Sequence, residues 1–363
     1  MKKKRILFTF CHLVSSNGVS RAAVGIANLI VRNRSDVEVT LMPLYKIDDD
    51  LVKNIDPNVK IKRRLGFYFR GLDKLLDLIP DRILYKLFVR EKYDIEVGYQ
   101  YWLPTKIIAS SSNKKSLKIA WMHGYDYGVT LLKYYQSLDK VICVSKCNAE
   151  RLIEESNNSV TCDYCYNPID DNAIRAFSRE AVIDEIENTK RPLFVTVGRL
   201  SPEKGYVRLL DVIYKLKSEG YEFNFWFIGS GALADDLKEK ADALNLTGYV
   251  SFLGEKKNPH KYTKMADAFV CSSFSEGYST ACTEAIMLGV PVISTAVSGA
   301  KEIIEASEAG IVTSIDDQGL YNGIKTVLDN QNLLKEWKNN LILSKRNFSL
   351  ETRKQKIFNV FNI

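Results

Sequence analysis

The stretch AFVCSSFSEGYSTACTEAIMLGVPVISTA, residues 268–296, reads as a strand, a loop, a helix and a second strand. AFVCSS and PVISTA are short apolar runs of the kind found in buried strands. Between them we expect a helix from Ser279 or Thr280 to Leu288, which the following Gly and Pro end. Two apolar strands joined by a helical crossover are typical of a parallel sheet covered on both faces.

The same alternation continues along the chain, more cleanly in the second half than in the first. Helical patterns with apolar residues three and four positions apart separate the strand candidates, as in GYVRLLDVIYKLKSEG and SRAAVGIANLIV. The predicted fold class is therefore α/β, with two doubly wound, Rossmann-like domains. The further strand candidates are KRILFTF, VEVTLMPL, DIEVGYQ, LKIAWMHG and KVICVSK in the first half, and PLFVTVGR, FNFWFIGSG, YVSFLG and GIVTS in the second.

Domain boundaries follow from the chain's length and from one linker. A length of 363 residues suits two domains, each with its own core. We expect the linker near Asn167 to Asp171, so that residues 1–170 form the first domain and residues 171–346 the second. The amphipathic segment from about residue 347 to residue 363 is expected to return to the first domain as a helix.

The search for targeting signals and the pattern of cysteines indicate where in the cell the protein is expected. No run of 18 apolar residues exists, which excludes a membrane-spanning helix and favours a cytoplasmic protein. The basic start imitates a signal peptide, but His12 interrupts its apolar run and favours a first buried strand. Seven cysteines, an odd number, are typical of reduced thiols. Cys143, Cys147, Cys162 and Cys165 are spaced loosely like a zinc ribbon, an alternative that their strand-like context disfavours.

Positive charge is concentrated in the first half. Residues 1–170 hold 27 Lys and Arg against 19 Asp and Glu, whereas the remaining residues hold 24 against 25. Within it, residues 60–92 hold ten basic residues against four acidic ones, mixed with aromatic and aliphatic side chains. This window predicts either a surface that docks on an anionic membrane or an amphipathic helical hairpin with a solvated basic face. The residues assigned to the membrane patch are Arg63, Arg64, Phe67, Phe69 and Arg70.

Two carboxylates, Glu276 and Glu284, lie eight positions apart in the opening stretch. On one continuous helix they would be about 12 Å apart along the axis, too far to share one proton or one metal ion. We expect Glu276 in the loop and Glu284 one turn into the helix. A capping box would explain Glu284 only with Ser or Thr three residues earlier, and that position is Ala281.

Ligands of doubly wound domains bind beyond the carboxyl ends of the strands, close to helix N-termini. Three segments of the second half are expected to converge there: GRLSPEKG, FIGSG and SFSEGYST, at residues 198–205, 227–231 and 273–280. In the first segment, Arg199 and Lys204 have the charge and spacing of a diphosphate clamp. Taken alone this signal is weak, because basic residues beside turns are usually solvated.

Together these segments resemble glycosyltransferase family 4, a group of retaining enzymes with the GT-B fold. The resemblance rests on E-x7-E in SEGYSTACTEAIMLGVPVI, on GRLSPEKG and FIGSG before it, and on TAVSGAKEII after it. YNPID and KVICVSK also match the family in the right order. The resemblance implies two Rossmann-like domains facing a central cleft, of which the first binds the acceptor and the second binds a nucleotide-sugar donor.

The resemblance also implies roles for residues of the second domain. Glu284 would bond the donor's ribose hydroxyls and Glu276 would face the donor sugar, while Arg199 and Lys204 would hold the diphosphate. The other donor-binding residues that it implies are Gly229, Gly231 and Leu253, whose backbone would contact the base, and Gly277, Tyr278, Ser279, Thr280 and Ala281 around the helix N-terminus.

In the first domain, the segment SSNGVSRA corresponds to the family's glycine-rich loop, which places Gly18 near the phosphates. The chain departs from the family here, because the second glycine and the Glu that are common in this loop are missing. WMHG matches the family's histidine segment and would bring His123 close to the donor sugar and the reacting carbon.

A sugar that leaves a nucleoside diphosphate departs from an anion, which cations and N–H dipoles stabilise better than a carboxylic acid does. We therefore expect a retaining transfer without metal or cofactor, in which the diphosphate held by Arg199 and Lys204 accepts the acceptor's proton. The alternative is a glycosidase pair, with Glu276 and Glu284 about 5 Å apart for retention. The loop-plus-helix arrangement does not require that distance.

The expected function is transfer of a hexose or N-acetylhexosamine from a nucleotide sugar, preferably UDP-linked, to a cell-surface glycan. The acceptor is expected to be lipid-linked and the enzyme peripheral on the inner face of the plasma membrane, with no nucleic acid partner. A noncatalytic glycosyltransferase-like protein is the alternative, and it would be expected to lose Glu276, Arg199 or Lys204. A dinucleotide-dependent oxidoreductase would want G-x-G-x-x-G after the first strand, which SSNGVS does not supply.

Overall fold

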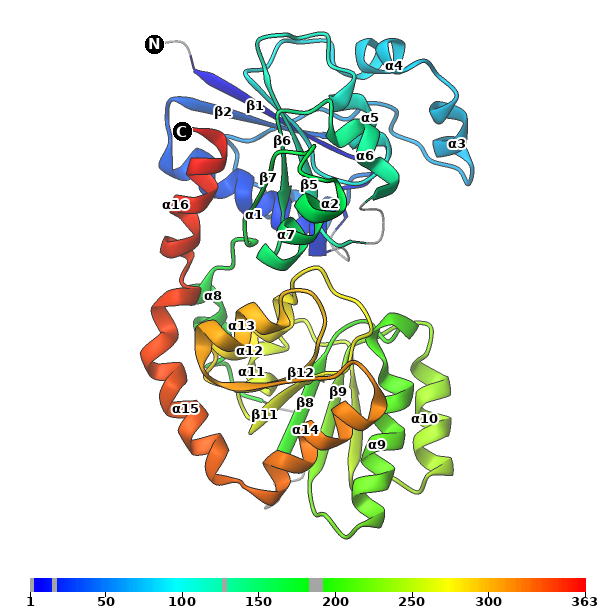
Figure 1. The fold of residues 1–363 in the computed structure, drawn as a ribbon, viewed down its shortest axis with the longest axis vertical. Coiled ribbons are helices and arrows are strands. Elements are labelled where there is room, and N and C mark those ends of the chain that lie inside the picture. Colours follow the sequence, from blue (N-terminus) through cyan, green and yellow to red (C-terminus); the bar gives the residue numbers. More distant parts are fainter. Residues whose placement is uncertain (1–2, 15–17, 126–128, 183–191) are drawn as a thin grey trace. The chain divides into compact units, whose positions relative to one another are not determined.

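The computed structural model describes residues 3–14, 18–125, 129–182 and 192–363. They form two compact units (Figure 1): unit 1 comprises Met1–Ile169 with Arg353–Ile363, and unit 2 comprises Asp170–Thr352. Most of the last helix, α16 (Leu350–Phe361), belongs to unit 1, from Arg353 onward. The ring of Phe361 lies 5.7 Å from that of Phe8 and 6.0 Å from that of Trp121.

Unit 1 is a doubly wound domain. Within the described residues it holds a seven-stranded parallel sheet in the order β3-β2-β1-β4-β5-β6-β7, so the strand order reverses between β1 and β4. β1 pairs with both neighbours at Ile6, which faces Val39 of β2 and Ile95 of β4. The strands are β1 (Lys4–Phe10), β2 (Val37–Pro43), β3 (Lys60–Ile61), β4 (Ile95–Gly98), β5 (Leu117–Met122), β6 (Lys140–Cys143) and β7 (Cys162–Tyr164).

Helices cover the sheet of unit 1 and bury its apolar strands, as the sequence pattern predicts. The strand residues Ile6, Leu7 and Phe8 have no exposed surface. The helices are α1 (Gly18–Asn33), α2 (Asp49–Val52), α3 (Leu72–Asp77), α4 (Asp81–Phe88), α5 (Leu103–Ala109), α6 (Leu132–Tyr135) and α7 (Lys146–Glu155), with a 3-10 turn η1 (Val129–Leu131).

Unit 2 repeats the architecture. Its described residues form a six-stranded parallel sheet in the order β10-β9-β8-β11-β12-β13, which reverses between β8 and β11. Ala268 of β11 faces Phe194 of β8 across that junction. The strands are β8 (Leu193–Val197), β9 (Asn224–Ile228), β10 (Val250–Gly254), β11 (Ala268–Cys271), β12 (Val292–Thr295) and β13 (Gly310–Thr313).

The opening stretch of sequence forms the predicted strand, loop and helix. Helix α12 begins at Thr280 with Ser279 as N-cap, and the chain turns beyond Leu288 at Gly289, whose φ is +82°. The helices and 3-10 turns of unit 2 are α8 (Asp171–Phe177), η2 (Pro202–Lys204), α9 (Tyr206–Ser218), α10 (Ala234–Ala243), α11 (His260–Thr263), α12 (Thr280–Met287), α13 (Ala300–Ser307), α14 (Asp317–Asp329), α15 (Asn332–Ser344) and η3 (Lys345–Phe348).

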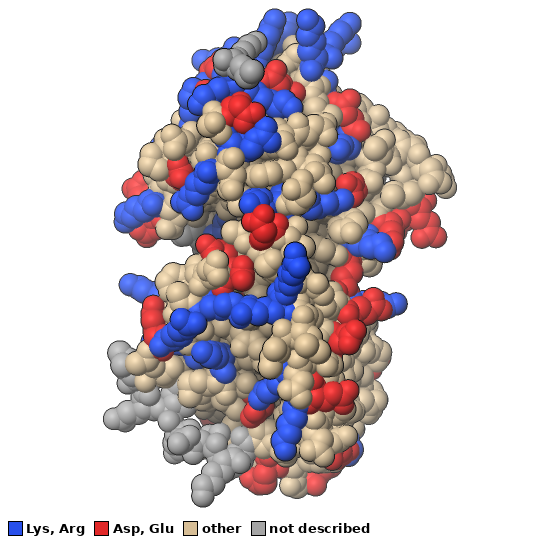
Figure 2. Space-filling view, turned by 90° about the vertical axis from the view of Figure 1, so that its left-hand side faces the viewer, with Lys and Arg blue, Asp and Glu red and all other residues tan. Residues whose placement is uncertain are grey.

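The basic window 60–92 forms β3 and the two helices of a hairpin, α3 and α4, with Pro80 as the N-cap of α4. β3 has no counterpart in the sequence prediction, because it is two exposed residues long. Of the expected membrane patch, Phe67 and Phe69 are 55% and 49% exposed. Arg64, by contrast, is half-buried. Its Nε–H points toward Met42 Sδ, 3.2 Å away. On the face shown in Figure 2, Lys and Arg lie over unit 1 and also form a band across unit 2.

The cysteines are all free thiols. Cys143 and Cys162 are neighbours, with their Sγ atoms 3.5 Å apart, whereas Cys147 is exposed. In the part of the chain that the structure describes, no three His, Cys, Asp or Glu side chains are grouped so that they could hold a metal ion. The zinc alternative therefore gains no support from these cysteines.

Candidate active site

The strand order of unit 2 places two segments side by side at its switch point, the loop after β8 and the loop after β11. Lys204 ends the first loop and Glu276 lies in the second. Their side chains meet, with Lys204 Nζ 2.7 Å from Glu276 Oε1. Ser273 Oγ donates a second hydrogen bond to the same carboxylate oxygen at 2.7 Å. The sheet topology thus assembles a lysine and a carboxylate where doubly wound domains bind ligands.

Both charged groups of this pair are largely withdrawn from water. Their side chains are 22% and 14% exposed for Lys204 and Glu276. Burial by itself would lower the pKa of Lys204, but the charge and the hydrogen bond of Glu276 raise it above its ordinary value. Lys204 is therefore a fixed cation at neutral pH.

Arg208, on the first turn of α9, fixes the backbone of the loop that carries Glu276. Its guanidinium donates to the carbonyl oxygens of Ser272 and Ser273, the latter at 3.1 Å, and also to Ile315 O. It lies 3.8 Å from the ring centroid of Phe274 and is 6% exposed. Sequence reasoning missed this residue, because an arginine within a helical pattern is expected on the solvated face.

Three glycines hold the loops of unit 2 close together. A Cβ at Gly229 would lie 1.9 Å from Gly198 O, and one at Gly231 would lie 2.4 Å from Leu200 O. Gly205, with a φ of +66°, passes so close to Ser272 O that its Cβ would lie 2.3 Å away. Gly229 and Gly231, expected at the base of the donor, thus lie against the loop that carries Arg199.

The N-terminus of α12 follows directly after Glu276. Ser279 caps it by accepting a hydrogen bond from Cys282 N at 3.3 Å. The backbone N–H groups of Thr280 and Ala281 precede the first intrahelical bond, so their dipoles can receive an anion. Gly277 and Tyr278 join this turn to Glu276, and Tyr278 is buried against Gly299.

Glu284 lies on the second turn of α12, as predicted, and it is partly buried. Its Oε2 is 3.8 Å from Nδ1 of His260, at the start of α11. The imidazole of His260 stacks at 6.3 Å and 13° on Phe177. No sequence rule pointed to His260, because its partner is 24 positions away and comes from another helix.

Arg199 and Leu253 complete the set expected in unit 2. The side chain of Arg199 is 74% exposed and lies near Glu203, with Nη2 to Oε1 at 3.9 Å. An exposed pair of this kind is weak, so Arg199 keeps the freedom to turn toward a ligand. Leu253 is half-buried near the carboxyl end of β10.

In unit 1, His123 follows β5 and its Nε2 lies 2.9 Å from Tyr99 O. A carbonyl can only accept, so Nε2 carries the hydrogen and Nδ1 is left as an acceptor. Burial lowers the pKa of His123 to about 4, although the hydrogen bond to Tyr99 opposes this shift. The imidazole is therefore neutral at physiological pH.

Gly18 is the exposed first residue of α1, and no described residue lies within 4 Å of where a Cβ would be. The preceding Ser15, Ser16 and Asn17 of the expected glycine-rich loop lie outside the described residues. Crowding by the described residues of unit 1 therefore does not require a glycine at position 18.

A cluster that sequence reasoning missed lies at the carboxyl ends of β1 and β2. Asp73 accepts hydrogen bonds from the hydroxyls of Tyr45 at 2.6 Å and Tyr68 at 3.2 Å. The ring of His12 packs on both tyrosines, with centroids 5.2 and 4.9 Å away. Gln100 ties β4 to this edge by accepting from Cys11 N and donating to His12 O. These residues come from four separate segments, so no local pattern announces them.

Comparison with known proteins identifies the fold. Residues 178–342 match the family model described as "Glycosyl transferases group 1". HepE of Anabaena, solved in complex with UDP, superposes with a TM-score of 0.76 over 100% of both chains at 17% identity. The protein therefore has the GT-B fold, and the comparisons support a glycosyltransferase.

Two curated relatives are similar to parts or most of the chain. The chain is 30% identical over 208 residues to an N-acetylgalactosaminyltransferase of Campylobacter jejuni that acts on N-acetylgalactosamine-N,N'-diacetylbacillosaminyl-diphospho-undecaprenol. That match covers 56% of this chain and 55% of the relative's length. The lipopolysaccharide core biosynthesis glycosyltransferase LpsE of Rhizobium meliloti is 22% identical over 90% of this chain and 89% of its own. The narrower assignment to glycosyltransferase family 4 stays a prediction.

Proposed function

We propose that the protein is a retaining glycosyltransferase that moves a hexose or N-acetylhexosamine from a nucleotide sugar, UDP-linked, to a lipid-linked glycan in cell-surface polysaccharide synthesis. The observation that carries this proposal is the Lys204–Glu276 pair at the switch point of unit 2, beside the N-terminus of α12. A cation and a carboxylate in contact, beside the N–H dipoles of a helix N-terminus, suit a ligand with an anionic and a hydroxylated part.

In this proposal unit 2 binds the donor. Lys204 and Arg199 hold the diphosphate together with the N–H groups of Thr280 and Ala281, and Glu276 receives the sugar hydroxyls. Glu284 bonds the ribose hydroxyls. The turn at Gly229 and Gly231 and the backbone of Leu253 contact the base. Gly277, Tyr278 and Ser279 form the turn that holds the diphosphate.

Unit 1 is proposed to bind the acceptor and to contribute Gly18 and His123. The neutral imidazole of His123 adds no charge next to the sugar, and its acceptor nitrogen can receive a hydroxyl proton as a hydrogen bond. The charge that develops on the leaving diphosphate is offset by Lys204, Arg199 and the helix dipole, so the transfer needs no proton from a carboxylic acid.

The relatives support the choice of substrates. One GT-B neighbour was solved with UDP, and the Campylobacter relative acts on a diphospho-undecaprenol-linked sugar. A lipid-linked acceptor would bring the enzyme to the inner membrane face, where the patch of Arg63, Arg64, Phe67, Phe69 and Arg70 is proposed to dock. In the described residues, no helix is both long and apolar enough to cross a bilayer.

The test is a thermal-shift screen of nucleotide sugars, followed by product analysis with the donor that stabilises the protein. We expect a UDP-sugar to raise the melting temperature of the wild type and not that of Glu284→Ala. The anomeric configuration of the product, read by NMR, should match that of the donor. An inverted product, or activity that a chelator abolishes and a divalent metal restores, would contradict the retaining, metal-independent mechanism.

A noncatalytic nucleotide-sugar-binding protein is the alternative. It predicts the same thermal shifts but no transfer to any lipid-linked acceptor and no slow hydrolysis of the donor. Release of UDP from the stabilising donor, measured with wild type and with Lys204→Met, separates the two. Release that Lys204→Met abolishes supports the enzyme.

A further inference from the structure

Helix α4 presents three different faces. Its inward face lies in the core of unit 1 and buries Leu84, Tyr85 and Phe88. Ile83 and Leu87, one turn apart, are 57% and 41% exposed. Arg82 and Lys86 form an exposed basic stripe beside them. An apolar stripe flanked by a basic one is the pattern of helices that lie in the interface of an anionic bilayer.

Helix α3 extends the apolar surface. Leu75 and Leu78 are 55% and 80% exposed, and Lys74 beside them is exposed as well. Leu78 and Ile83 lie on either side of Pro80, so the hairpin formed by α3 and α4 (Figure 1) carries apolar side chains on both helices. Several large exposed apolar residues close together indicate an interaction surface.

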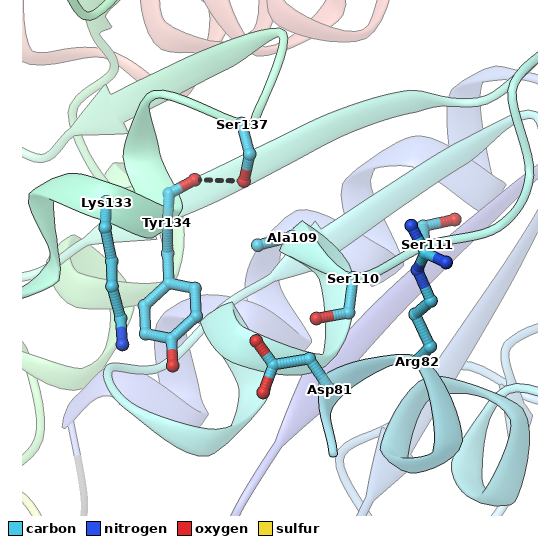
Figure 3. A pocket seen from close by; sticks show the side chains of 8 residues that line it. All are labelled: Asp81, Arg82, Ala109, Ser110, Ser111, Lys133, Tyr134 and Ser137. Carbon is cyan, nitrogen blue, oxygen red and sulfur yellow. Dashed lines mark hydrogen bonds between the residues drawn. The ribbon is translucent and has the colours of Figure 1, made fainter.

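A cavity of about 470 Å³ opens beside this hairpin, between α4, α5 and α6. Figure 3 shows Arg82 on one side of it and Lys133 with Tyr134 on the other, with Asp81 and Ser110 between them. The residues that line it are Asp81, Arg82, Ala109, Ser110, Ser111, Lys133, Tyr134 and Ser137. Its volume is within the range of small-molecule sites, about 300–1,000 Å³, but most of its lining side chains are polar or charged, which suits a polar group rather than an apolar ligand.

The charges around the cavity are not balanced. The carboxylate of Asp81 lies 3.3 Å from Nζ of Lys106, a buried lysine that also pairs with Asp77 at 2.7 Å. In contrast, neither Arg82 nor Lys133 makes an ion pair with any residue that the structure describes; Lys133 only lies 4.6 Å from the ring centroid of Tyr134. Two cations and several hydroxyls are therefore available to an anion in the cavity.

We propose that the α3–α4 hairpin lies on an anionic bilayer and that the cavity takes the phosphate headgroup of one of its phospholipids. The hairpin's apolar side chains then contact the acyl chains of the lipid whose headgroup Arg82 and Lys133 bind. This inference specifies the membrane location in the proposed function and moves its centre from residues 63–70 to the hairpin. It involves no donor-binding residue.

The first experiment measures co-sedimentation of the full chain with vesicles. Wild type should bind vesicles of phosphatidylcholine with 30% phosphatidylglycerol (about a third of the lipid, so that surface charge is substantial) and not vesicles of phosphatidylcholine alone. A lysine or arginine that lies near the membrane surface without binding a headgroup contributes about a factor of five to the affinity for anionic vesicles. We expect that loss for Lys86→Gln, a loss of more than about 20-fold for Arg82→Gln and Lys133→Gln, and none for Lys335→Gln, an exposed lysine of unit 2.

The second experiment isolates the cavity from the surface. Dihexanoyl-phosphatidylglycerol below its critical micelle concentration should raise the melting temperature of wild type, because a monomer can occupy the cavity without a bilayer. Ser137→Leu, which fills the cavity without changing charge, should abolish this shift and keep the far-UV circular dichroism of wild type. Ile83→Ser with Leu87→Ser should weaken vesicle binding and leave occupancy of the cavity by the monomer intact.

Each result decides the proposal. Vesicle binding that is absent, or equal for phosphatidylcholine alone, overturns the membrane surface. Vesicle binding with no response to the monomer and no effect of Ser137→Leu overturns the headgroup site and leaves a surface-charge effect only. Equal stabilisation by inorganic phosphate identifies a free-anion site and also overturns it. The thermal shift with the UDP-sugar should persist in every variant, so its loss in wild type would count against the proposed function instead.

Discussion

Lys204 and Glu276 are 72 residues apart in the chain, and their charged atoms are 2.7 Å apart at the switch point of unit 2. The pair has different effects in the free protein and in the protein that binds a diphosphate. In the free protein the carboxylate offsets the charge of a partly buried lysine. When a diphosphate arrives, Lys204 can exchange or share that partner, which leaves Glu276 to bond neutral hydroxyls.

Exchange of partners predicts opposite effects of the two substitutions on UDP affinity. Lys204→Met should weaken UDP binding by about 10- to 100-fold, because a charge-assisted hydrogen bond contributes about 1.5–3 kcal/mol. Glu276→Gln should leave UDP affinity unchanged or higher, since no carboxylate then competes for Lys204, while the transfer rate falls by about 100-fold or more. Isothermal titration with UDP and initial rates measure both. Equal loss of UDP affinity in the two variants would mean that the pair has a purely structural role.

Arg208 should act on catalysis through the loop that it holds. Arg208→Ala removes the donors to Ser272 O and Ser273 O and leaves these carbonyls buried, so we expect about 2–4 kcal/mol less stability by urea unfolding. The transfer rate should fall more than UDP affinity does, because Arg208 is 6% exposed and its guanidinium already bonds the carbonyl groups of Ser272 and Ser273. Val207→Ala, an exposed neighbour on the same helix, is the control and should change neither quantity. A fall in stability without a change in kcat would show that the loop keeps Glu276 in position even when Arg208 is absent.

The architecture could be predicted from the sequence because its signals are local. Apolar runs and 3.6-residue periodicity predicted the strands and helices of both sheets, and Ser279 with Gly289 bounded α12. Parallel strands then required the loops after β8 and β11 to share an edge. β3 escaped detection, since a two-residue strand owes its existence to its neighbour β2 rather than to its own sequence.

The side-chain partners could not be predicted, because each depends on a distant segment. The burial of Arg208 is set by carbonyl groups 64 and 65 positions away. The contacts of Asp73 with Tyr45 and of His260 with Glu284 are likewise tertiary. In each case an ordinary polar residue becomes a candidate functional group only when the fold supplies its partner.

Two glycines of unit 2, Gly231 and Gly289, allow the cost of a steric clash to be measured apart from the cost of backbone strain. Gly231→Ala places a Cβ 2.4 Å from Leu200 O, so we expect the protein to lose more than about 2 kcal/mol of stability and its UDP-induced thermal shift. Gly289 has a φ of +82°, but among the described residues no atom lies within 4 Å of where its Cβ would be, so Gly289→Ala should cost only about 1 kcal/mol and keep UDP binding. Equal costs in chemical denaturation would show that the loops after β8 and β9 can move apart.

His123 gives the stability of the protein a defined response to acid. Its pKa is about 4 in the folded protein and 6.5 ordinarily, so between these values the unfolded chain binds more protons. Stability should therefore fall as the pH is lowered through this window, by roughly 2 kcal/mol between pH 7 and pH 5 from this group alone. His123→Gln, whose amide can still donate to Tyr99 O, should show a flatter profile in urea denaturation at the two pH values. His12 and His260 remain in both proteins, so the difference between the profiles isolates His123. Identical profiles would mean that His123 takes up its proton in the folded state as readily as in the unfolded one.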